Sequence, residues 1–599
     1  MLSNLLFTIP ELRTAYENGV HPVDVIDEIF ARLEAVDDPA IFIHLCDREA
    51  LRAEAGALGA FDPDKALWGI PFAAKDNIDV AGLPTTAACP AYAYTPSTDA
   101  YVIAKLRASG ALMIGKTNLD QFATGLVGVR SPYGAPRNSV DPLVVPGGSS
   151  GGSGVIVGHG IVSFSLGTDT AGSGRVPAAL NNIVGLKPSL GALSASGVVP
   201  ACRTLDTISI FALTVDDAYA AFDVAADFDE ADAYARPIAT NALHAVPSGL
   251  RVGVPDAKSI EFFGDEIQEQ AFRRDVAVLA ASGADIVEVD FTPFYDVAHM
   301  LYEGAWVAER YTVIEDLLKE DPDAVHPVTR QIICHAESLS AADAFRGMYR
   351  LQDLKRVAEA ALAELDLLCV PTIPTFYSVA DLEADPVTPN SNFGTYTNFV
   401  NLLDMCGIAV PTAPRGDGQP GSVTLLARFG EDALTASVAR YFELDCPRNL
   451  GATDHKATGI SPLSNQAKSD RMELAVCGAH MADLPLNWQL TDRDGAFVRA
   501  AKTSANYKFY ALAGGPPERP GLVRTEGSGS QPIGLEIWSL PMDHVGSFLG
   551  GIPSPLGLGS VELDDGSYVK GFICEASGTA GARDISEFGD WRTYLSSKN

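Results

Sequence analysis

The sequence is short of positive charge. Its 599 residues carry 43 Lys and Arg against 76 Asp and Glu, which gives a formal net charge of −33 at pH 7. Nucleic acid is therefore not an expected partner, because phosphate binding needs a positive surface. Hydrophobic residues make up 47% of the chain and charged residues 20%, a balance typical of folded proteins and not of disordered ones. The length predicts more than one domain.

Long hydrophobic runs are also missing. The richest apolar stretch, 155–166, is interrupted by Gly158, His159 and Gly160. It is shorter than the roughly 18 apolar residues that a membrane helix requires, so no membrane span is expected. The first residues, MLSNLLFTIPELR, lack a basic segment and turn acidic at Glu11. A secretion signal is therefore not predicted.

The cysteines and histidines of the sequence do not occur in the paired spacings of metal-binding or redox motifs. Nine cysteines lie between Cys46 and Cys574 without a CxxC pair. An odd, scattered set favours reduced thiols and a cytoplasmic location. The ten histidines include no HExxH motif and no paired ligand spacing, so no metal site is expected.

The first 450 residues have the sequence pattern of an α/β domain. Residues 1–60 are predicted to be helical, because apolar residues recur there at three- and four-residue spacing. From Leu67 onward, short β-like runs such as GIPFAAKDN, ALMIGKTN and GVIVGHGIVSFSLGTD alternate with helical stretches. This alternation predicts a sheet covered by helices. Helical patterns return at 393–405 and 432–444, and the domain is expected to close near residue 450.

The last part of the chain reads as a separate unit. Residues 451–470 have no large aromatic side chain and many polar and turn-forming residues, which predicts an exposed linker. Residues 471–599 contain strand-like runs such as MELAVCGAH and YVKGFICEA, with only short helical patterns between them. We therefore expect a smaller α+β domain there, with a small sheet or barrel.

Three segments carry the residue types of serine hydrolysis. The first, GGSSGGSG at 147–154, could be a linker or a phosphate loop, but no GK[ST] follows and strand-like sequence resumes at Val155. The second, GTDTAGSGR at 167–175, places Ser173 among small residues whose N–H groups can bind an oxyanion. The third places Lys75 behind an apolar strand pattern, where a buried lysine is costly without a function or a partner.

Together these segments resemble the amidase signature family over nearly all of residues 1–450. Ser149 and Ser173 are 24 residues apart, which is the family's spacing. The resemblance implies a mixed sheet covered by helices on both faces. It also implies that Ser173 is the nucleophile, that Ser149 is a bridging serine after a cis peptide from Gly148, and that Lys75 is the base acting through Ser149. The N–H groups of Thr170, Ala171, Gly172 and Ser173 would form the oxyanion hole.

The implied chemistry is consistent with elementary acid–base requirements. A serine hydroxyl needs a base within hydrogen-bond reach. Lysine accepts a proton only when neutral, so its pKa must fall from about 10.4 by roughly 3 units, mostly through burial. Each residue also has an ordinary structural interpretation: Lys75 at a strand end on the surface, Ser149 in a turn, Ser173 as a helix N-cap. The joint order and spacing favour the catalytic interpretation.

Two further segments narrow the substrate by resemblance. NLDQFATGLVGVRSPYG at 118–134 resembles allophanate hydrolases, and VCGAHMADLPLN at 476–487 resembles the start of their additional C-terminal domain. The resemblance implies hydrolysis of allophanate to ammonia through an acyl-enzyme, without a cofactor, and decarboxylation of the carboxycarbamate product by the C-terminal domain. Alternatives are a general small-amide amidase, a glutamyl-tRNA amidotransferase-like subunit, or a scaffold whose Gly-rich loops bind a partner without chemistry.

Allophanate is an anion, so the pocket must be locally positive in this acidic protein. Tyr302 and Arg310 are eight residues apart, which places them on a shared face if one helix spans both. The resemblance implies that they hold the substrate carboxylate, for which arginine is suited; Arg310 could instead pair with a neighbouring glutamate. Thr124 and Gly125 would line the pocket through backbone groups.

Arg175 and His480 are the remaining candidates. Arg175 is expected to brace the nucleophile loop or to pair with Asp169, although it could be the carboxylate anchor in place of Arg310. His480 is polar and follows a strand in the C-terminal unit, so it is either a functional group there or a structural histidine. Family resemblance further implies a homodimer and functional coupling to urea carboxylase.

Overall fold

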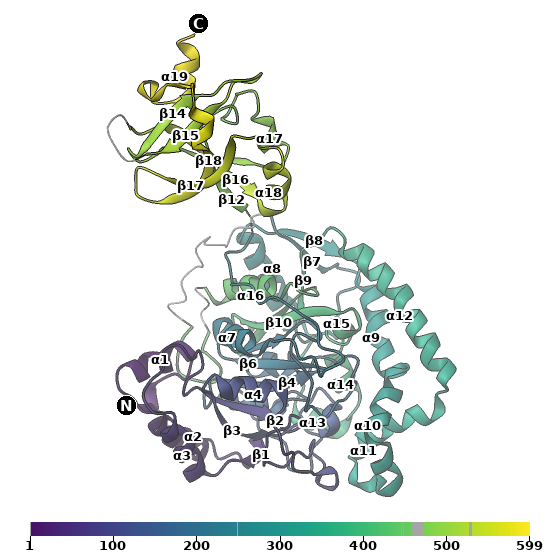
Figure 1. The fold of residues 1–599 in the computed structure, drawn as a ribbon. Helices are drawn as coiled ribbons and strands as arrows, with labels where there is room; N and C mark the ends of the chain where they lie inside the picture. Colours follow the sequence, from purple (N-terminus) through teal and green to yellow (C-terminus); the bar gives the residue numbers. More distant parts are fainter. Residues whose placement is uncertain are drawn as a thin grey trace. The chain divides into compact units, whose positions relative to one another are not determined.

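The chain separates into two units, Met1–Ser464 and Asn465–Asn599, in a computed structural model that describes residues 2–247, 249–444, 446, 448–457, 471–525 and 530–598 (Figure 1). Residues 458–470 of the predicted linker lie outside the described residues. Its first part, 451–457, hydrogen-bonds within the first unit: the Ala452 N–H donates to the Gly158 carbonyl at 2.8 Å. Those residues are therefore packed against the first unit. The boundaries at 450 and 471 stay predictions.

A single mixed sheet organises the first unit. In the described residues it has 11 strands in the order β1-β3-β2-β4-β6-β5-β10-β11-β9-β7-β8. The strands are β1 Phe42–Leu45, β2 Pro71–Lys75, β3 Leu112–Thr117, β4 Phe164–Asp169, β5 Val184–Lys187, β6 Thr207–Ala212, β7 Arg251–Pro255, β8 Asp285–Val289, β9 Leu367–Pro371, β10 Met405–Thr412 and β11 Gly421–Arg428. β2 lies between β3 and β4 and is parallel to both, whereas β4 and β6 are antiparallel.

Both faces of this sheet are covered, as the alternation of side chains along β9 shows. Leu367 and Cys369 belong to one apolar core, whereas Leu368 and Val370 belong to another. Successive side chains of a strand point to opposite faces, so the two cores lie on opposite sides of the sheet. The predicted mixed sheet with helices on both faces is confirmed.

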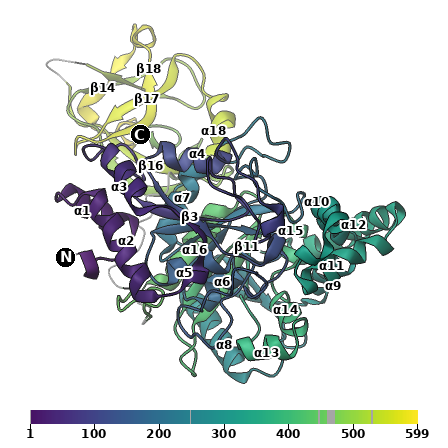
Figure 2. The ribbon, with the colours of Figure 1, turned by 90° about the horizontal axis from the view of Figure 1, so that it is seen from below.

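Helices of varied length connect the strands. They are α1 Ile9–Glu17, α2 Pro22–Val36, α3 Arg48–Ala57, α4 Tyr101–Ala108, α5 Gly151–Gly158, α6 Val176–Leu180, α7 Val215–Ala225, α8 Glu266–Ala281, α9 Thr292–Glu303, α10 Trp306–Glu320, α11 Pro327–Cys334, α12 Ala341–Leu362, α13 Val379–Ala384, α14 Thr388–Phe393, α15 Phe399–Leu402 and α16 Asp432–Glu443. Figures 1 and 2 both show α9 to α12 gathered at one side of the unit, beside the sheet.

The second unit is strand-rich with short helices, as expected for an α+β domain. Its strands are β12 Arg471–Val476, β13 Ala496–Lys502, β14 Tyr507–Ala511, β15 Pro520–Arg524, β16 Gly534–Pro541, β17 Leu556–Glu562, β18 Tyr568–Cys574 and β19 Arg583–Asp584. They form a five-stranded sheet, β13-β16-β12-β18-β17, and a three-stranded sheet, β15-β14-β19. The helices are α17 Trp488–Thr491, α18 Met542–Leu549 and α19 Trp591–Ser596.

The structure corrects three local predictions. The N-terminal 60 residues are not wholly helical, because β1 within them pairs antiparallel with β3. The run after the first Gly-rich motif begins as helix α5, not as a strand, and the strand β4 starts only at Phe164. The predicted helix at 393–405 reduces to the short α15, and Met405 already starts β10. Short apolar runs fit a buried helix or a buried strand equally well, so periodicity alone could not separate them.

Candidate active site

Lys75 is the last residue of β2 and lies in the interior of the first unit. The strand before it is apolar, and the ring of Phe72 stacks on Phe164 of the neighbouring strand at 5.3 Å between centroids. The lysine side chain is fully buried. Its Nζ lies 2.7 Å from the Ser149 Oγ and 2.7 Å from the Thr168 Oγ1. Among the described residues, the amine therefore hydrogen-bonds two hydroxyl groups and no carboxylate.

Burial makes Lys75 much easier to deprotonate than a lysine in water. Desolvation is the largest influence and lowers the pKa of Lys75 to about 7. The carboxylates of Asp120, Asp206 and Asp169 oppose that shift, and the positive charge of Arg310 adds to it. A substantial fraction of Lys75 is consequently neutral near pH 7, which is the condition for accepting a proton.

Ser149 is held in place by the Gly-rich segment before α5. The Gly148–Ser149 peptide is cis, as the resemblance implied. The Ser149 carbonyl accepts the N–H of Asp120 at 2.9 Å. A Cβ on Gly148 would lie 2.0 Å from the Asp120 Oδ2 and 2.5 Å from the Gly128 nitrogen, so only glycine fits there. The glycines of this motif thus allow close backbone packing around the serine.

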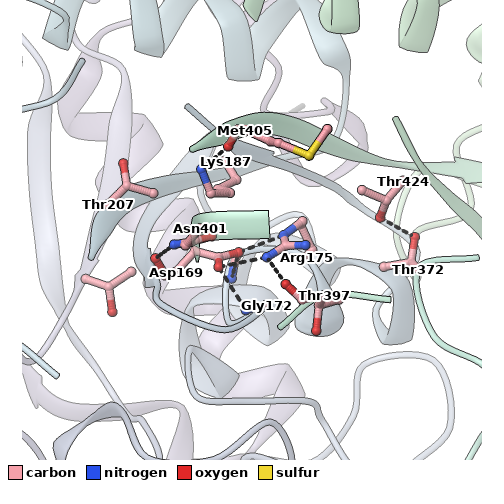
Figure 3. Close-up of polar contacts among 12 residues, drawn as sticks. Asp169, Gly172, Arg175, Lys187, Thr207, Thr372, Thr397, Asn401, Met405 and Thr424 are labelled. Carbon is pink, nitrogen blue, oxygen red and sulfur yellow. Dashed lines mark hydrogen bonds and ion pairs between the residues drawn. The ribbon is translucent and has the colours of Figure 1, made fainter. Parts of the chain in front are cut away.

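Ser173 lies in the loop between β4 and α6, which an ion pair braces. Arg175 Nε and Nη2 bond the Asp169 carboxylate at 2.9 and 3.0 Å, and both side chains are fully buried (Figure 3). Arg175 Nη2 also donates to the Thr397 carbonyl at 3.2 Å. The expected Arg175–Asp169 pairing is confirmed. The Nε and Nη2 groups of Arg175 both bind this carboxylate, so they are not available to bind a substrate carboxylate in the same way.

The predicted oxyanion hole needs one correction, at Gly172. Its N–H donates to the Asp169 Oδ1 at 2.8 Å, so this group is already engaged (Figure 3). Within the described residues, no acceptor takes the N–H of Thr170, Ala171 or Ser173. Gly172 instead supplies backbone shape: its φ is +132°, and a Cβ there would lie 2.5 Å from the Thr397 Oγ1.

The structure joins two of the three predicted triad residues directly. Lys75 bonds Ser149, and its second partner Thr168 lies on β4, five positions before Ser173 in the same segment. Ser173 is 1% exposed. No hydrogen bond joins Ser149 and Ser173 in the described part of the chain, so the second step of the predicted relay stays a prediction.

Arg310 presents an unpaired cationic edge inside the protein. The residue is 2% exposed, and its Nη1 donates to the Thr124 Oγ1 at 3.1 Å. Its Nε and Nη2 have no hydrogen-bond partner among the residues that the structure describes. These two nitrogens form one edge of the guanidinium, the geometry that accepts a carboxylate bidentately. The alternative that Arg310 pairs with a neighbouring glutamate at the surface is excluded by its burial and its unpaired nitrogens.

Tyr302 and Arg310 are neighbours, but they do not share one helix as predicted. α9 ends at Glu303 and α10 begins at Trp306, and Gly304 between them has extended backbone, φ −124° and ψ −158°. The fold nevertheless places the guanidinium of Arg310 5.2 Å from the centre of the Tyr302 ring. Burial raises the pKa of the Tyr302 hydroxyl, so it remains protonated and able to donate a hydrogen bond.

The loop around Thr124 and Gly125 contacts Arg310 through the Thr124 side chain, whereas the sequence predicted a role for its backbone groups. The Thr124 hydroxyl accepts from Arg310, and the Thr124 carbonyl accepts from Arg130 Nη1 at 3.1 Å. Gly125 has a φ of +157°, and a Cβ on it would lie 2.6 Å from the Asp120 Oδ2. Thr124 and Gly125 therefore form part of the protein interior next to Arg310.

Two residues in this region were not singled out from the sequence. The Thr168 side chain provides the second hydroxyl group that contacts Lys75. The feature of the sequence that could have indicated this role is a polar residue near the end of an apolar strand. Asp206 accepts the Thr170 hydroxyl and the N–H of Ala201 at 2.7 Å, and burial raises its pKa to about 6. Nothing in the sequence around Asp206 indicated that it lies beside the loop that contains Ser173.

His480 lies in the second unit at a cavity. Its Nε2 is 2.9 Å from the Gln489 Oε1, and its ring stacks on Phe572 at 4.9 Å between centroids. Burial lowers its pKa, so the ring is neutral near pH 7. These contacts allow either interpretation of His480 made from the sequence.

Other kinds of site have no support in the described ranges. No group of three or more His, Cys, Asp or Glu side chains there could hold a metal ion. None of the described helices has the length and apolar content to cross a membrane. All nine cysteines are free thiols.

The pKa of Lys75 predicts a pH profile. If Lys75 is the base predicted from the sequence, only its neutral form can act, and kcat/KM for the predicted amide hydrolysis should rise about tenfold per pH unit below the pKa and level off above it. That pKa is about 7. Initial rates measured from about pH 5.5 to about pH 8.5 define this rising part of the profile, the acidic limb. His326→Asn removes a titratable ring near Arg130 and should leave the limb in place. A profile without this limb in the native protein would contradict the assignment of Lys75.

Comparison with known proteins assigns both units. A family model described as amidase matches residues 24–435, and one described as allophanate hydrolase C-terminal domain matches residues 472–596. A solved allophanate hydrolase structure from Kluyveromyces lactis is 42% identical, with a TM-score of 0.81, and covers 99% of this chain and 100% of that chain.

Curated relatives extend the comparison. A urea amidolyase of Lachancea kluyveri is 46% identical over 550 residues, which is 88% of this chain but 30% of the relative. The chain therefore spans less than a third of that relative's length. A glutamyl-tRNA(Gln) amidotransferase subunit of Nitratidesulfovibrio vulgaris (strain DP4) is 34% identical over 470 residues, 72% of this chain and 94% of the relative.

Proposed function

The chain belongs to the amidase family, and we propose that it hydrolyses allophanate at a site containing Lys75, Ser149, Ser173 and Arg310. The observation that carries the proposal is the unpaired edge of Arg310 in the same unit as Lys75, whose pKa burial lowers to about 7. A buried cation with two unsatisfied N–H groups is costly unless an anion completes it. A general small-amide amidase has no use for such a group, whereas allophanate carries a carboxylate beside its amide.

The proposed reaction begins with a proton relay. Neutral Lys75 takes the proton of Ser149 as Ser149 takes that of Ser173, whose Oγ attacks the terminal amide carbon. The N–H groups of Ala171 and Ser173 hold the developing oxyanion; single donors of this kind are typically worth about 3 kcal/mol. Collapse breaks the C–N bond, and the proton returns along the relay to the leaving ammonia.

The second half of the reaction opens the acyl-enzyme. Water attacks the ester of Ser173 with the same relay acting as base, which releases carboxycarbamate and restores the serine. Arg310 retains the substrate carboxylate through both steps, and the Tyr302 hydroxyl donates to it. No step uses a cofactor. The C-terminal domain then promotes decarboxylation of this product, with His480 as its candidate functional group.

Substrate comparison tests the proposal. We expect kcat/KM for ammonia release from allophanate to exceed that from acetamide or glutamine by at least about 100-fold, the worth of a buried charge pair. Strong turnover of acetamide or glutamine without turnover of allophanate would instead support a general amidase or an amidotransferase-like subunit. The scaffold alternative predicts that a serine-directed fluorophosphonate fails to label Ser173.

The cellular setting is part of the proposal and rests on resemblance. Functional coupling to urea carboxylase is supported by a longer relative that is named a urea amidolyase. Free thiols at all nine cysteines agree with a cytoplasmic location. A homodimer is also proposed. Analytical ultracentrifugation of the full chain tests this last point.

A further inference from the structure

The segment 199–206 connects the parts of the first unit that carry the proposed site. At its start, the Val199 N–H donates to the Asn77 carbonyl at 2.8 Å, and the Asn77 Nδ2 donates back to the Val199 carbonyl at 3.0 Å. Asn77 comes two residues after Lys75, the last residue of β2. The segment is therefore fixed to the chain directly after the catalytic lysine.

The middle of this segment is fixed to the first turns of α10, the helix that carries Arg310. The Thr204 N–H and hydroxyl donate to the two carboxylate oxygens of Glu309 at 2.8 and 2.7 Å. The Cys202 thiol contacts the carbonyl of Trp306 at 3.6 Å. Glu309 and Trp306 both precede Arg310 on α10. These contacts set where the guanidinium lies relative to the segment.

The end of the segment contacts the loop that contains Ser173 through Asp206. One oxygen of the partly buried carboxylate accepts the Thr170 hydroxyl, and the other accepts the Ala201 N–H at 2.7 Å. Hydrogen bonds to an ionised acceptor are stronger than those between neutral groups. Thr170 directly precedes Ala171, whose N–H is proposed to hold the oxyanion. Asp206 therefore fixes the side chain next to the oxyanion donors.

Asn401 of α15 adds a second link between the segment and this loop. Its Nδ2 donates to the Leu205 carbonyl and to the Asp169 carbonyl, both at 2.8 Å, and Figure 3 shows the bond to Asp169. Leu205 belongs to the segment, and Asp169 is the last residue of β4 before the loop. The contact made by Asp206 is thus part of a braced arrangement and not an isolated surface pair.

We propose that Asp206 is a positioning residue of the reaction, which holds the Thr170 hydroxyl and the adjacent oxyanion donors in a fixed place relative to Lys75 and Arg310. The inference rests on the proposed function and deepens it, because it links the helix that binds the substrate carboxylate to the loop that attacks the amide. Asp206 contacts no reacting atom and acts through Thr170.

The Asp206 carboxylate also acts on the site through its charge. Burial lowers the pKa of Lys75, and Asp206 is one of three carboxylates, with Asp120 and Asp169, that oppose this shift. Its charge also favours the cationic form of Arg310. Removal of this negative charge should ease deprotonation of Lys75 and favour an anion beside Arg310. Damage to the fold alone would produce neither effect.

Asp206→Asn in the full chain tests the proposal. An amide accepts only through its oxygen, so it cannot serve both the Thr170 hydroxyl and the Ala201 N–H. We expect kcat for allophanate at about pH 8.5 to fall at least about tenfold without a rise in KM. Desolvation raises the pKa of Asp206 to about 6. Above that pH, where the native carboxylate is ionised, the acidic limb should move to lower pH in the variant. An unchanged kcat, a raised KM or an unmoved limb overturns the proposal.

Variants of Thr170 separate the hydrogen bond from the charge. Thr170→Val removes the hydroxyl and keeps the Asp206 carboxylate, so kcat should fall about tenfold while the acidic limb stays in place. Thr170→Ser keeps the hydroxyl and should retain kcat within about threefold. Full retention of kcat in Thr170→Val would show that the contact with Asp206 does not position the loop.

Asp217→Asn is the matched control for loss of an acidic side chain. This buried carboxylate accepts the Ile9 N–H at 3.0 Å, and burial raises its pKa to about 7. Its replacement should lower the unfolding temperature but leave kcat, KM and the acidic limb unchanged. A limb that moves equally in Asp217→Asn and Asp206→Asn would mean that the shift reports on stability, and it would overturn the proposal.

Labelling of Ser173 by a fluorophosphonate keeps this test separate from the proposed function, because the reagent needs the nucleophile and its base but not allophanate. Asp206→Asn should slow labelling at about pH 8.5 at least about tenfold. Labelling at the native rate overturns the role of Asp206 and leaves the proposed function standing. Absence of allophanate turnover by the unmodified protein contradicts the proposed function, while the labelling rates still measure the positioning role.

Discussion

Replacing Ser173 by alanine is expected to reduce ammonia release from allophanate by at least about 1000-fold. The Oγ of this residue is proposed to be the atom that forms the acyl-enzyme, and neither the lysine nor the N–H groups of the loop could replace it. The substitution removes one oxygen that makes no hydrogen bond within the described residues. The folded structure should therefore persist, which thermal unfolding checks alongside the rate.

Two neighbouring serines provide a matched comparison for this experiment. Ser149→Ala removes the hydroxyl that lies 2.7 Å from the Lys75 Nζ and should cost nearly as much as the loss of the nucleophile. Ser150→Ala removes an equally buried hydroxyl whose hydrogen bonds within the described residues go to the Thr168 backbone, at 3.3 and 3.4 Å, and should lower the rate less than about tenfold. Equal losses in both variants would mean that the relay does not run through Ser149.

Arg310→Met is expected to lower kcat/KM for allophanate by about 100- to 1000-fold. Two nitrogens of the guanidinium have no hydrogen-bond partner in the described ranges of the chain, and the substrate carboxylate is proposed to bind there. Methionine keeps much of the apolar volume of the side chain, so the loss reports on charge and not on packing. Steady-state rates over a range of allophanate concentrations give the value.

Turnover of biuret distinguishes two possible roles of Arg310, recognition of the substrate carboxylate and support of the fold. Biuret carries an amide where allophanate carries its carboxylate. The Arg310→Met penalty should be less than about tenfold on biuret, which gains little from the cation. A penalty equal on both substrates would show that Arg310 supports the fold. Nearly intact turnover of allophanate would return the anchoring role to Arg175, in spite of its pairing with Asp169.

Much of the fold could be predicted because its signals are local. The apolar run ending at Lys75 forms β2, and the strand-like sequence before the GTDTAGSGR motif ends as β4. Local signals failed where a glycine or a short apolar run is compatible with two conformations. The sequence predicts one helix through Tyr302 and Arg310, but the helix is interrupted at Gly304. A Cβ at this position would lie 2.7 Å from the Met300 carbonyl oxygen.

The sequence by itself determined the order of the motifs, the spacing of Ser149 and Ser173, and those strands and helices that have a clear local pattern, since these depend on residues close together in the chain. Only the tertiary structure decided the charge state of Lys75, because its pKa depends on how completely other segments exclude water from it. The same holds for the free edge of Arg310 and the engaged N–H of Gly172. Whether a polar group is satisfied depends on partners that folding brings from distant parts of the chain, which no local pattern specifies.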